Sequence, residues 1–181
     1  FGLPHAGHLS VLRARAWLPL DTLLATTRGS AVVGEPGSSA AFYAQAWLPE
    51  REPRAVVVIS HGLAEHSGRY APLASRLVDR GYAVYALDHR SHGRSSGPRA
   101  NIGRFAYLVS DLGAFVGRTQ RQHPDASIFL LGHSMGGAIA LACASQHPGA
   151  RVVATDISDA ALAVARKNAA RLKLADRVEF R

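Results

Sequence analysis

The stretch that decides the fold of this chain is Phe129-Leu130-Leu131-Gly132-His133-Ser134-Met135-Gly136-Gly137. An apolar run of strand length, Ser127–Leu131, leads into it, and an alanine-rich segment of helical composition, Gly137–Gln146, follows it. A serine with a glycine two residues away on either side, between a strand and a helix, is typical of a sharp turn that presents a nucleophile above a sheet edge. Ser134 is therefore the candidate nucleophile. The N–H of Met135, at the start of the expected helix, is a candidate oxyanion donor.

An earlier segment supplies the second half of this predicted site. Ala55–Ser60 is a continuous apolar run rich in β-branched residues, which indicates a parallel strand covered on both faces. His61-Gly62-Leu63 follows it directly, and the loop after such a strand supplies the other oxyanion N–H in enzymes built around this kind of turn. We therefore expect the N–H of Leu63 to be the second donor. The His61 side chain is expected to fix the loop through hydrogen bonds rather than to act as a base.

Strands and helices alternate along most of the chain. The expected strands are 42–48, 55–60, 82–87, 127–131, 151–155 and 178–180, and the expected helices are 70–80, 102–122, 137–146 and 159–172. This alternation predicts an α/β fold with a doubly wound, mostly parallel sheet. Residues 39–181 are expected to form one domain. Residues 1–38 are a poorly defined segment, in which the mixture of apolar residues and arginines over His8–Thr27 favours a short helix.

The composition is that of an ordinary globular chain, with 48% hydrophobic and 19% charged residues over 181 positions. No apolar run reaches the roughly 18 residues of a membrane span. The net charge of +8 comes almost entirely from scattered arginines without a block of like charges, so we do not expect a nucleic-acid partner. The single cysteine, Cys143, excludes an internal disulfide and favours a reducing, cytoplasmic compartment. We expect neither a metal nor a cofactor.

Three blocks of the sequence together resemble one enzyme family. They are His61–Tyr70, Ala86–Gly97 and Phe129–Gly137. They are similar to the monoacylglycerol lipase and lysophospholipase group, whose α/β-hydrolase domain is also called serine aminopeptidase-like, over about residues 40–147. The commonest form of the second block has glycine where this chain has Ser91. The resemblance implies Ser134 as the nucleophile, Leu63 and Met135 as oxyanion donors, and hydrolysis of a small fatty-acyl ester, with transient contact to a membrane surface.

The sequence departs from that family after the nucleophile. In the family, an acid and then a base follow the nucleophile serine, with a cap over the acyl pocket between them. No histidine follows His147 in this chain, and no segment corresponds to the cap, so we expect a truncated fold without a cap. A serine needs a base to act as a nucleophile at neutral pH. The remaining candidates for the base are His61, His66, His89 and His92, and Asp156 is a tentative acid.

The segment after the nucleophile helix resembles a different family. Residues 150–180 are similar to S-adenosylmethionine-dependent methyltransferases, notably the release-factor glutamine methyltransferases, in which the acid that matches Asp156 binds the cofactor ribose. The glycine loop of that family is absent here. Its place is taken by residues that include His133 and Met135, whose side chains would fill the cofactor's path. The Asn-Pro-Pro-Tyr motif of the glutamine methyltransferases is also missing.

The sequence therefore leaves three functions open. The leading hypothesis is a lipase-like serine esterase that acts through Ser134. The second is a nucleotide or S-adenosylmethionine binder that uses Asp156. The third is a non-catalytic remnant that folds without turning over an ester.

Overall fold

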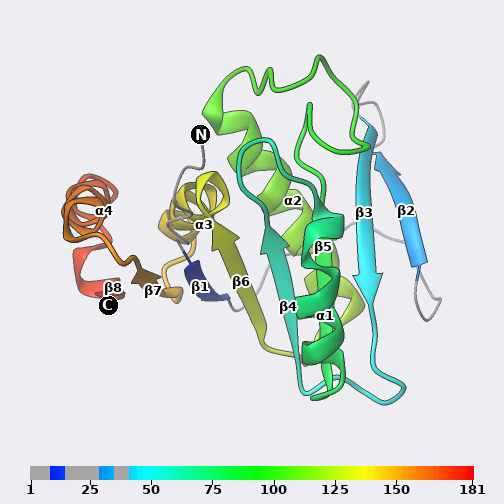
Figure 1. The fold of residues 1–181 in the computed structure, drawn as a ribbon. Coiled ribbons are helices and arrows are strands. Elements are labelled where there is room, and N and C mark those ends of the chain that lie inside the picture. Colours follow the sequence, from blue (N-terminus) through cyan, green and yellow to red (C-terminus); the bar gives the residue numbers. More distant parts are fainter. Residues whose placement is uncertain (1–8, 15–28, 35–40) are drawn as a thin grey trace.

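A computed structural model describes residues 9–14, 29–34 and 41–181, which form a single eight-stranded sheet with helices packed against it (Figure 1). The strand order across the sheet is β2-β3-β5-β4-β6-β1-β7-β8. The strands are β1 (Leu9–Ala14), β2 (Gly29–Gly34), β3 (Ala41–Trp47), β4 (Ala55–Ser60), β5 (Tyr82–Leu87), β6 (Ile128–His133), β7 (Arg151–Thr155) and β8 (Val178–Phe180).

The α/β architecture expected from the sequence is confirmed, but the sheet is mixed rather than mostly parallel. The central strand β4 pairs in parallel with β5 and β6, and β7 pairs in parallel with β8. The other four pairings are antiparallel. They join β2 to β3 and β3 to β5 at one edge of the sheet, and β1 to both β6 and β7. The parallel centre is the part that the alternation of strands and helices predicted.

The helix favoured over His8–Thr27 is wrong for the part of it that the structure describes. Residues 9–14 form β1, which pairs on both sides, with Leu9 opposite His133 of β6 and opposite Thr155 of β7. The rest of the segment, residues 8 and 15–27, lies outside the described residues. A short run of mixed polarity has no strong preference of its own, so two neighbouring strands with free backbone groups decide its conformation.

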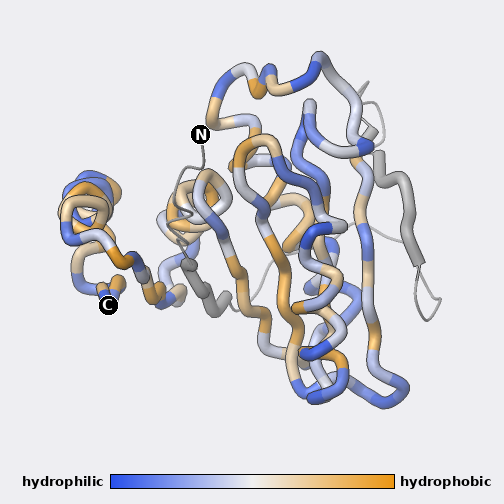
Figure 2. The backbone as a smooth tube through the Cα atoms, in the orientation of Figure 1, coloured by the Kyte–Doolittle hydropathy of each residue, from blue (hydrophilic) through white to orange (hydrophobic). Residues whose placement is uncertain are grey.

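Helices cover both faces of the central strands. Figure 1 shows α1 (Ala71–Val78) in front of the sheet, and α2 (Phe105–Gln122) and α3 (Met135–Ser145) behind it or beside it. Alternate residues of β4 point into two separate cores. Val56 and Val58 pack in the cluster under α2 and α3, whereas Val57 and Ile59 pack in the cluster that includes Ala74 of α1. The apolar colouring of β4 in Figure 2 is that of a strand buried on both sides, as its continuous apolar sequence predicted.

The C-terminal segment adds α4 (Asp159–Arg171) and a short 3₁₀ helix, η2 (Ala175–Arg177). Another short 3₁₀ helix, η1 (Ser67–Tyr70), lies between β4 and α1. The guanidinium of Arg177 donates hydrogen bonds to the carbonyl oxygens of Ala144 and His147. These carbonyls lie at the C-terminal end of α3, where a helix lacks partners of its own and where a positive charge is favoured. Arg177 thus ties η2 to the helix that begins next to Ser134.

Cys143 lies on the inner face of α3. Its side chain is buried, and the thiol donates to the carbonyl oxygen of Val109 at 3.5 Å. Burial raises the pKa of the Cys143 thiol to about 12, since a thiolate would lose its hydration there.

Candidate active site

Ser134 occupies the sharp turn between β6 and α3, as the sequence predicted. Its backbone has φ 53° and ψ −119°, a conformation that L residues other than glycine rarely adopt. The residue is exposed to solvent. Backbone strain of this kind persists only where the surrounding structure enforces it, and it is concentrated at functional sites.

The two glycines of the turn are required by close backbone contacts. A Cβ on Gly132 would lie 2.4 Å from the carbonyl oxygen of Gly136. A Cβ on Gly136 would lie 2.0 Å from the carbonyl oxygen of Ser60 and 2.6 Å from that of His61. The absence of both side chains therefore lets the start of α3 rest directly on the end of β4. This contact brings the loop after β4 next to the turn that holds Ser134.

The two residues predicted to supply oxyanion amides flank that contact. Met135 is the first residue of α3, so its N–H has no carbonyl of the same helix to bond. Leu63 follows Gly62 in the loop after β4, and the residue is 56% exposed. A Cβ on Gly62 would lie only 3.2 Å from Nδ1 of His133, so the two loops touch one residue before Leu63 and two residues before Met135.

One residue of this site was not predicted from the sequence. Glu65 reaches back from the loop after β4, and its Oε2 accepts hydrogen bonds from the N–H of Gly62 at 3.0 Å and the hydroxyl of Tyr70 at 2.8 Å. The same oxygen lies 3.2 Å from Nδ1 of His133. A charged residue in a loop is ordinarily a solvated surface group, so the only available signal was its position four residues before Arg69, its ion-pair partner.

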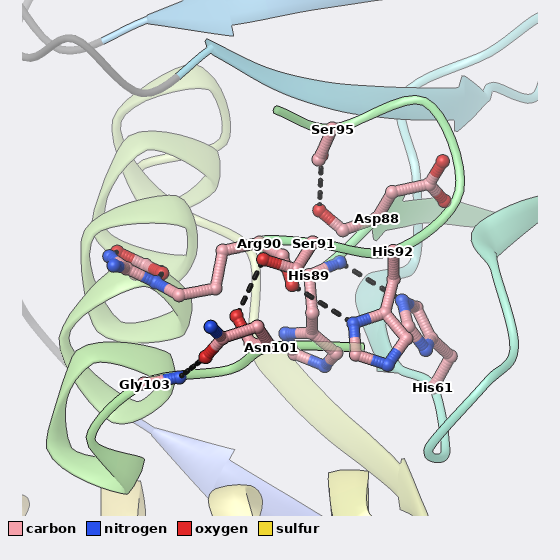
Figure 3. Close-up of polar contacts among 10 residues, drawn as sticks. His61, Asp88, His89, Arg90, Ser91, His92, Ser95, Asn101 and Gly103 are labelled. Carbon is pink, nitrogen blue, oxygen red and sulfur yellow. Dashed lines mark hydrogen bonds and ion pairs between the residues drawn. The ribbon is translucent and has the colours of Figure 1, made fainter. Parts of the chain in front are cut away.

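Three of the four candidate bases lie together in a buried cluster. The ring centroids of His61 and His89 are 4.5 Å apart, and those of His61 and His92 are 5.4 Å apart (Figure 3). All three side chains are buried. Burial is the largest of the effects that lower the pKa of His61 to about 4 and that hold the pKa of His89 well below its usual value. The rings of His61 and His89 are therefore neutral at pH 7.

The hydrogen bonds of this cluster fix loops rather than activate a nucleophile. His61 donates from Nδ1 to the carbonyl oxygen of Gly62 at 2.8 Å, and its Nε2 accepts the backbone N–H of His89 at 2.9 Å. His89 bonds Ser60 Oγ through Nε2, and His92 bonds the carbonyl oxygen of Arg90 through Nδ1. The expectation that His61 holds the loop agrees with these contacts. The fourth candidate, His66, is exposed and precedes η1. No histidine of the described ranges hydrogen-bonds the Ser134 hydroxyl.

Asp156, the tentative acid, lies directly after β7. Its Oδ1 accepts the N–H of Ser158 at 2.8 Å, in the turn that begins α4. Asp156 and Ser134 line the same cavity, which has a volume of about 1080 Å³. The other walls are mostly apolar and come from α2, α3 and α4, with Phe105, Leu141 and Leu162 among them. This volume is near the upper end of the range for small-molecule sites, about 300–1,000 Å³.

At residue 91, the loop after β5 has a left-handed backbone conformation that favours glycine. Ser91 has a left-handed φ of 64°, and its hydroxyl donates to the carbonyl oxygen of Asn101 at 2.7 Å (Figure 3). That hydrogen bond offsets the strain of the left-handed backbone, which costs about 1 kcal/mol for a residue with a Cβ. Asp88 braces the same loop by accepting the N–H groups of Ser67 and Arg94.

Replacement of Ser91 separates these two effects. Ser91→Ala keeps the strain and loses the hydrogen bond, so we expect the free energy of unfolding to fall by about 1–2 kcal/mol. Ser91→Gly loses both, so we expect a change near zero. Urea unfolding of the two variants beside the parent chain measures the difference. Equal stability of Ser91→Ala and Ser91→Gly would contradict the assignment of strain to this residue.

No group of three or more histidine, cysteine or acidic side chains in the described part of the chain is arranged to hold a metal ion. Of the helices in the described ranges, none has the length and apolar character needed to cross a membrane.

Comparison with known proteins places this geometry in a family. Residues 51–178 match the family model described as serine aminopeptidase, S33. The chain is 47% identical over 103 residues to the monoacylglycerol lipase of Mycolicibacterium smegmatis, which is 57% of this chain and 37% of that protein. It is 45% identical over 103 residues to the human monoglyceride lipase, covering 57% of this chain and 34% of that protein. The chain thus spans about a third of the length of these relatives.

Solved structures share the fold. A thermostable carboxyl esterase from Bacillus coagulans superposes with a TM-score of 0.60 at 27% identity, over 69% of this chain and 42% of that one. A soluble variant of the monoglyceride lipase from Saccharomyces cerevisiae superposes with a TM-score of 0.59 at 26% identity, over 70% of this chain and 41% of that one.

The family match bears on the methyltransferase resemblance stated above for the C-terminal segment. The match runs through residue 178 and so includes most of residues 150–180, in which the sequence resembled methyltransferases. None of these comparisons supports the methyltransferase likeness, and β7, α4 and β8 continue the sheet as a further strand–helix–strand unit. On the match over residues 51–178 and the turn that presents Ser134, this chain belongs to the serine aminopeptidase, S33 family of α/β-hydrolases.

Proposed function

We propose that this chain carries the nucleophile and the oxyanion amides of a serine hydrolase that cleaves fatty-acyl esters of the monoacylglycerol or lysophospholipid type. One observation supports this proposal above the others: Ser134 is exposed on a strained turn that is pressed against the loop after β4. The names of the relatives, which include monoacylglycerol lipase and lysophospholipase, agree with the substrate class.

In the proposed reaction, Ser134 Oγ attacks the ester carbonyl carbon and gives up its proton to a general base. The N–H groups of Leu63 and Met135 receive the negative charge that develops on the carbonyl oxygen. The carbon–oxygen bond to the alcohol then breaks, the alcohol leaves with a proton, and water releases the acid from Ser134. His61, His89 and His92 are committed to loop hydrogen bonds, so turnover requires a base other than these three. Asp156 is a candidate to orient that base, because it lines the same cavity as Ser134.

The apolar cavity beside Ser134 suits the acyl chain of such a substrate. Exposed apolar side chains near the same end of the sheet, Leu63 and Phe105 among them, suit transient contact with a membrane surface. A cytoplasmic location also belongs to this proposal, supported by the lone, buried thiol of Cys143.

Covalent labelling of the nucleophile tests the proposal. A fluorophosphonate probe is expected to label the parent chain once, at Ser134, and Ser134→Ala is expected to lose all labelling. Ser75→Ala, on the exposed side of α1, is the matched control and should label like the parent. Labelling that persists in Ser134→Ala would assign the reaction to another residue. A parent chain that folds but takes up no probe would overturn the proposal in favour of the non-catalytic alternative.

A further inference from the structure

Glu65 connects two loops that are far apart in the sequence. Its Oε2 takes a hydrogen bond from Gly62 in the loop after β4, and it also lies against His133 at the end of β6, 68 residues away. Its other oxygen, Oε1, lies 3.2 Å from Nη1 of Arg69. The Glu65 side chain is only 12% exposed. Burial alone would raise the pKa of Glu65, but the hydrogen bonds from Tyr70, Gly62 and His133 outweigh it and lower the pKa to about 2.

Two of the three partners of Oε2, Gly62 and His133, are direct neighbours of site residues. Gly62 immediately precedes Leu63, and His133 immediately precedes Ser134 and lies two residues before Met135. Gly62 is therefore one residue, and His133 two residues, from an amide that the proposed function assigns to the oxyanion. We propose that Glu65 is a positioning residue that sets the separation of these two amides by holding Gly62 and His133 on a single carboxylate oxygen. This inference rests on the proposed function.

Other contacts already fix the shape of the loop after β4 on its own. His61 bonds the carbonyl oxygen of Gly62, and the N–H of Glu65 donates to that same carbonyl oxygen at 3.3 Å. Neither of these bonds reaches β6. Beyond the last pair of the β4–β6 ladder, Ser60 and Gly132, the carboxylate is thus a polar contact that links Gly62 directly to His133. Hydrogen bonds to a charged acceptor are about twice as strong as neutral ones, which suits a contact that must hold a distance.

The rate of an oxyanion-dependent reaction depends steeply on such a distance. Donor groups must lie at about 2.7–3.1 Å from the oxyanion, and a displacement of about 1 Å costs on the order of 100-fold in rate. Glu65→Gln keeps the size of the side chain and an oxygen that accepts from Gly62, but it removes the charge that faces His133. Tyr70→Phe is the matched control, because it removes another hydrogen bond to the same oxygen, one that involves neither Gly62 nor His133.

Two measurements on the full chain test the inference. We expect Glu65→Gln to slow fluorophosphonate labelling of Ser134 by about 10- to 100-fold, and Tyr70→Phe to slow it by less than about 3-fold. We also expect amide hydrogen exchange at Gly62 and His133 to rise together in Glu65→Gln and to stay at the parent rate in Tyr70→Phe. A purely structural role would instead give both variants the same loss of melting temperature and the same loss of labelling.

The exchange measurement keeps this inference distinct from the proposed function. Parent-like exchange at Gly62 and His133 in Glu65→Gln, or labelling at the parent rate, would overturn the positioning role. If the parent chain takes up no probe, the proposed function fails and the catalytic meaning of Glu65 fails with it. A coupled rise in exchange would then show only that the carboxylate links the two loops.

Discussion

Gly136→Ala is expected to abolish labelling of Ser134 and to lower the free energy of unfolding by about 3 kcal/mol or more. The new Cβ would lie 2.0 Å from the carbonyl oxygen of Ser60. That oxygen belongs to the backbone of β4, where Ser60 pairs with Gly132 of β6, so it cannot swing aside as a flexible side chain would. Overpacking of this kind costs about 1–3 kcal/mol even where side chains can yield. Urea unfolding and probe labelling measure the two effects.

Gly113→Ala is the matched control for that variant. Gly113 lies within α2, and a Cβ there would meet nothing within 4 Å. Alanine is favoured over glycine inside a helix by about 1 kcal/mol, so Gly113→Ala is expected to be as stable as the parent or slightly more stable, with unchanged labelling. A Gly136→Ala chain with parent stability and parent labelling would show that α3 does not rest on the end of β4.

Lowering the pH from 6.5 to 4 is expected to remove about 3 kcal/mol of stability through His61 alone. Burial is the main reason that the pKa of His61 falls from 6.5 to about 4 in the folded chain, with a smaller contribution from His92, whereas Asp88 and Glu65 act in the opposite direction. Below pH 6.5 the unfolded chain takes up a proton that the folded chain refuses, so stability falls as the pH falls. Each pKa unit corresponds to about 1.4 kcal/mol. The loss is complete near pH 4, where folded His61 also becomes protonated.

His89 adds to the effect in the same direction, because its pKa is also lowered by burial and by His61 and His92. Glu65 acts in a separate window, since its pKa falls from 4.5 to about 2 and its contribution is lost only below pH 4.5. Urea unfolding at intervals from pH 7.5 to 4 measures the profile. His66→Gln, which removes an exposed histidine, should leave the slope unchanged. A flat profile between pH 6.5 and 4 would mean that the buried histidines do not resist protonation.

The parts of the fold that could be predicted are those in which local pattern and burial agree. The expected bounds of 55–60 and 82–87 coincide with β4 and β5, because strands buried on both faces consist of continuous apolar residues. The start of α3 is less clear from the sequence. Three glycines around Ser134 weaken the helical signal, so the prediction began the helix at Gly137, whereas it begins at Met135.

Only those parts of the site that lie within continuous sequence motifs could be predicted. Ser134 stands out because its glycines, strand and helix are neighbours in the chain. The link through Glu65 joins residues 68 positions apart, and neither partner indicates the other. The histidines show the same limit. A pattern names His61, His89 and His92 as possible bases, but only packing shows that all three are buried and hydrogen-bonded to neighbouring segments.

The buried thiol of Cys143 allows the motion of this chain to be followed with a fluorophore on an introduced cysteine. The Cys143 thiol is buried on the inner face of α3 and has a pKa near 12. At neutral pH it therefore does not supply the thiolate that reacts with maleimides and disulfide reagents. A second cysteine introduced at an exposed surface position would therefore react alone in the native state. A fluorophore attached beside the loop after β4 could then report the opening of that loop in real time, without first removing the natural thiol.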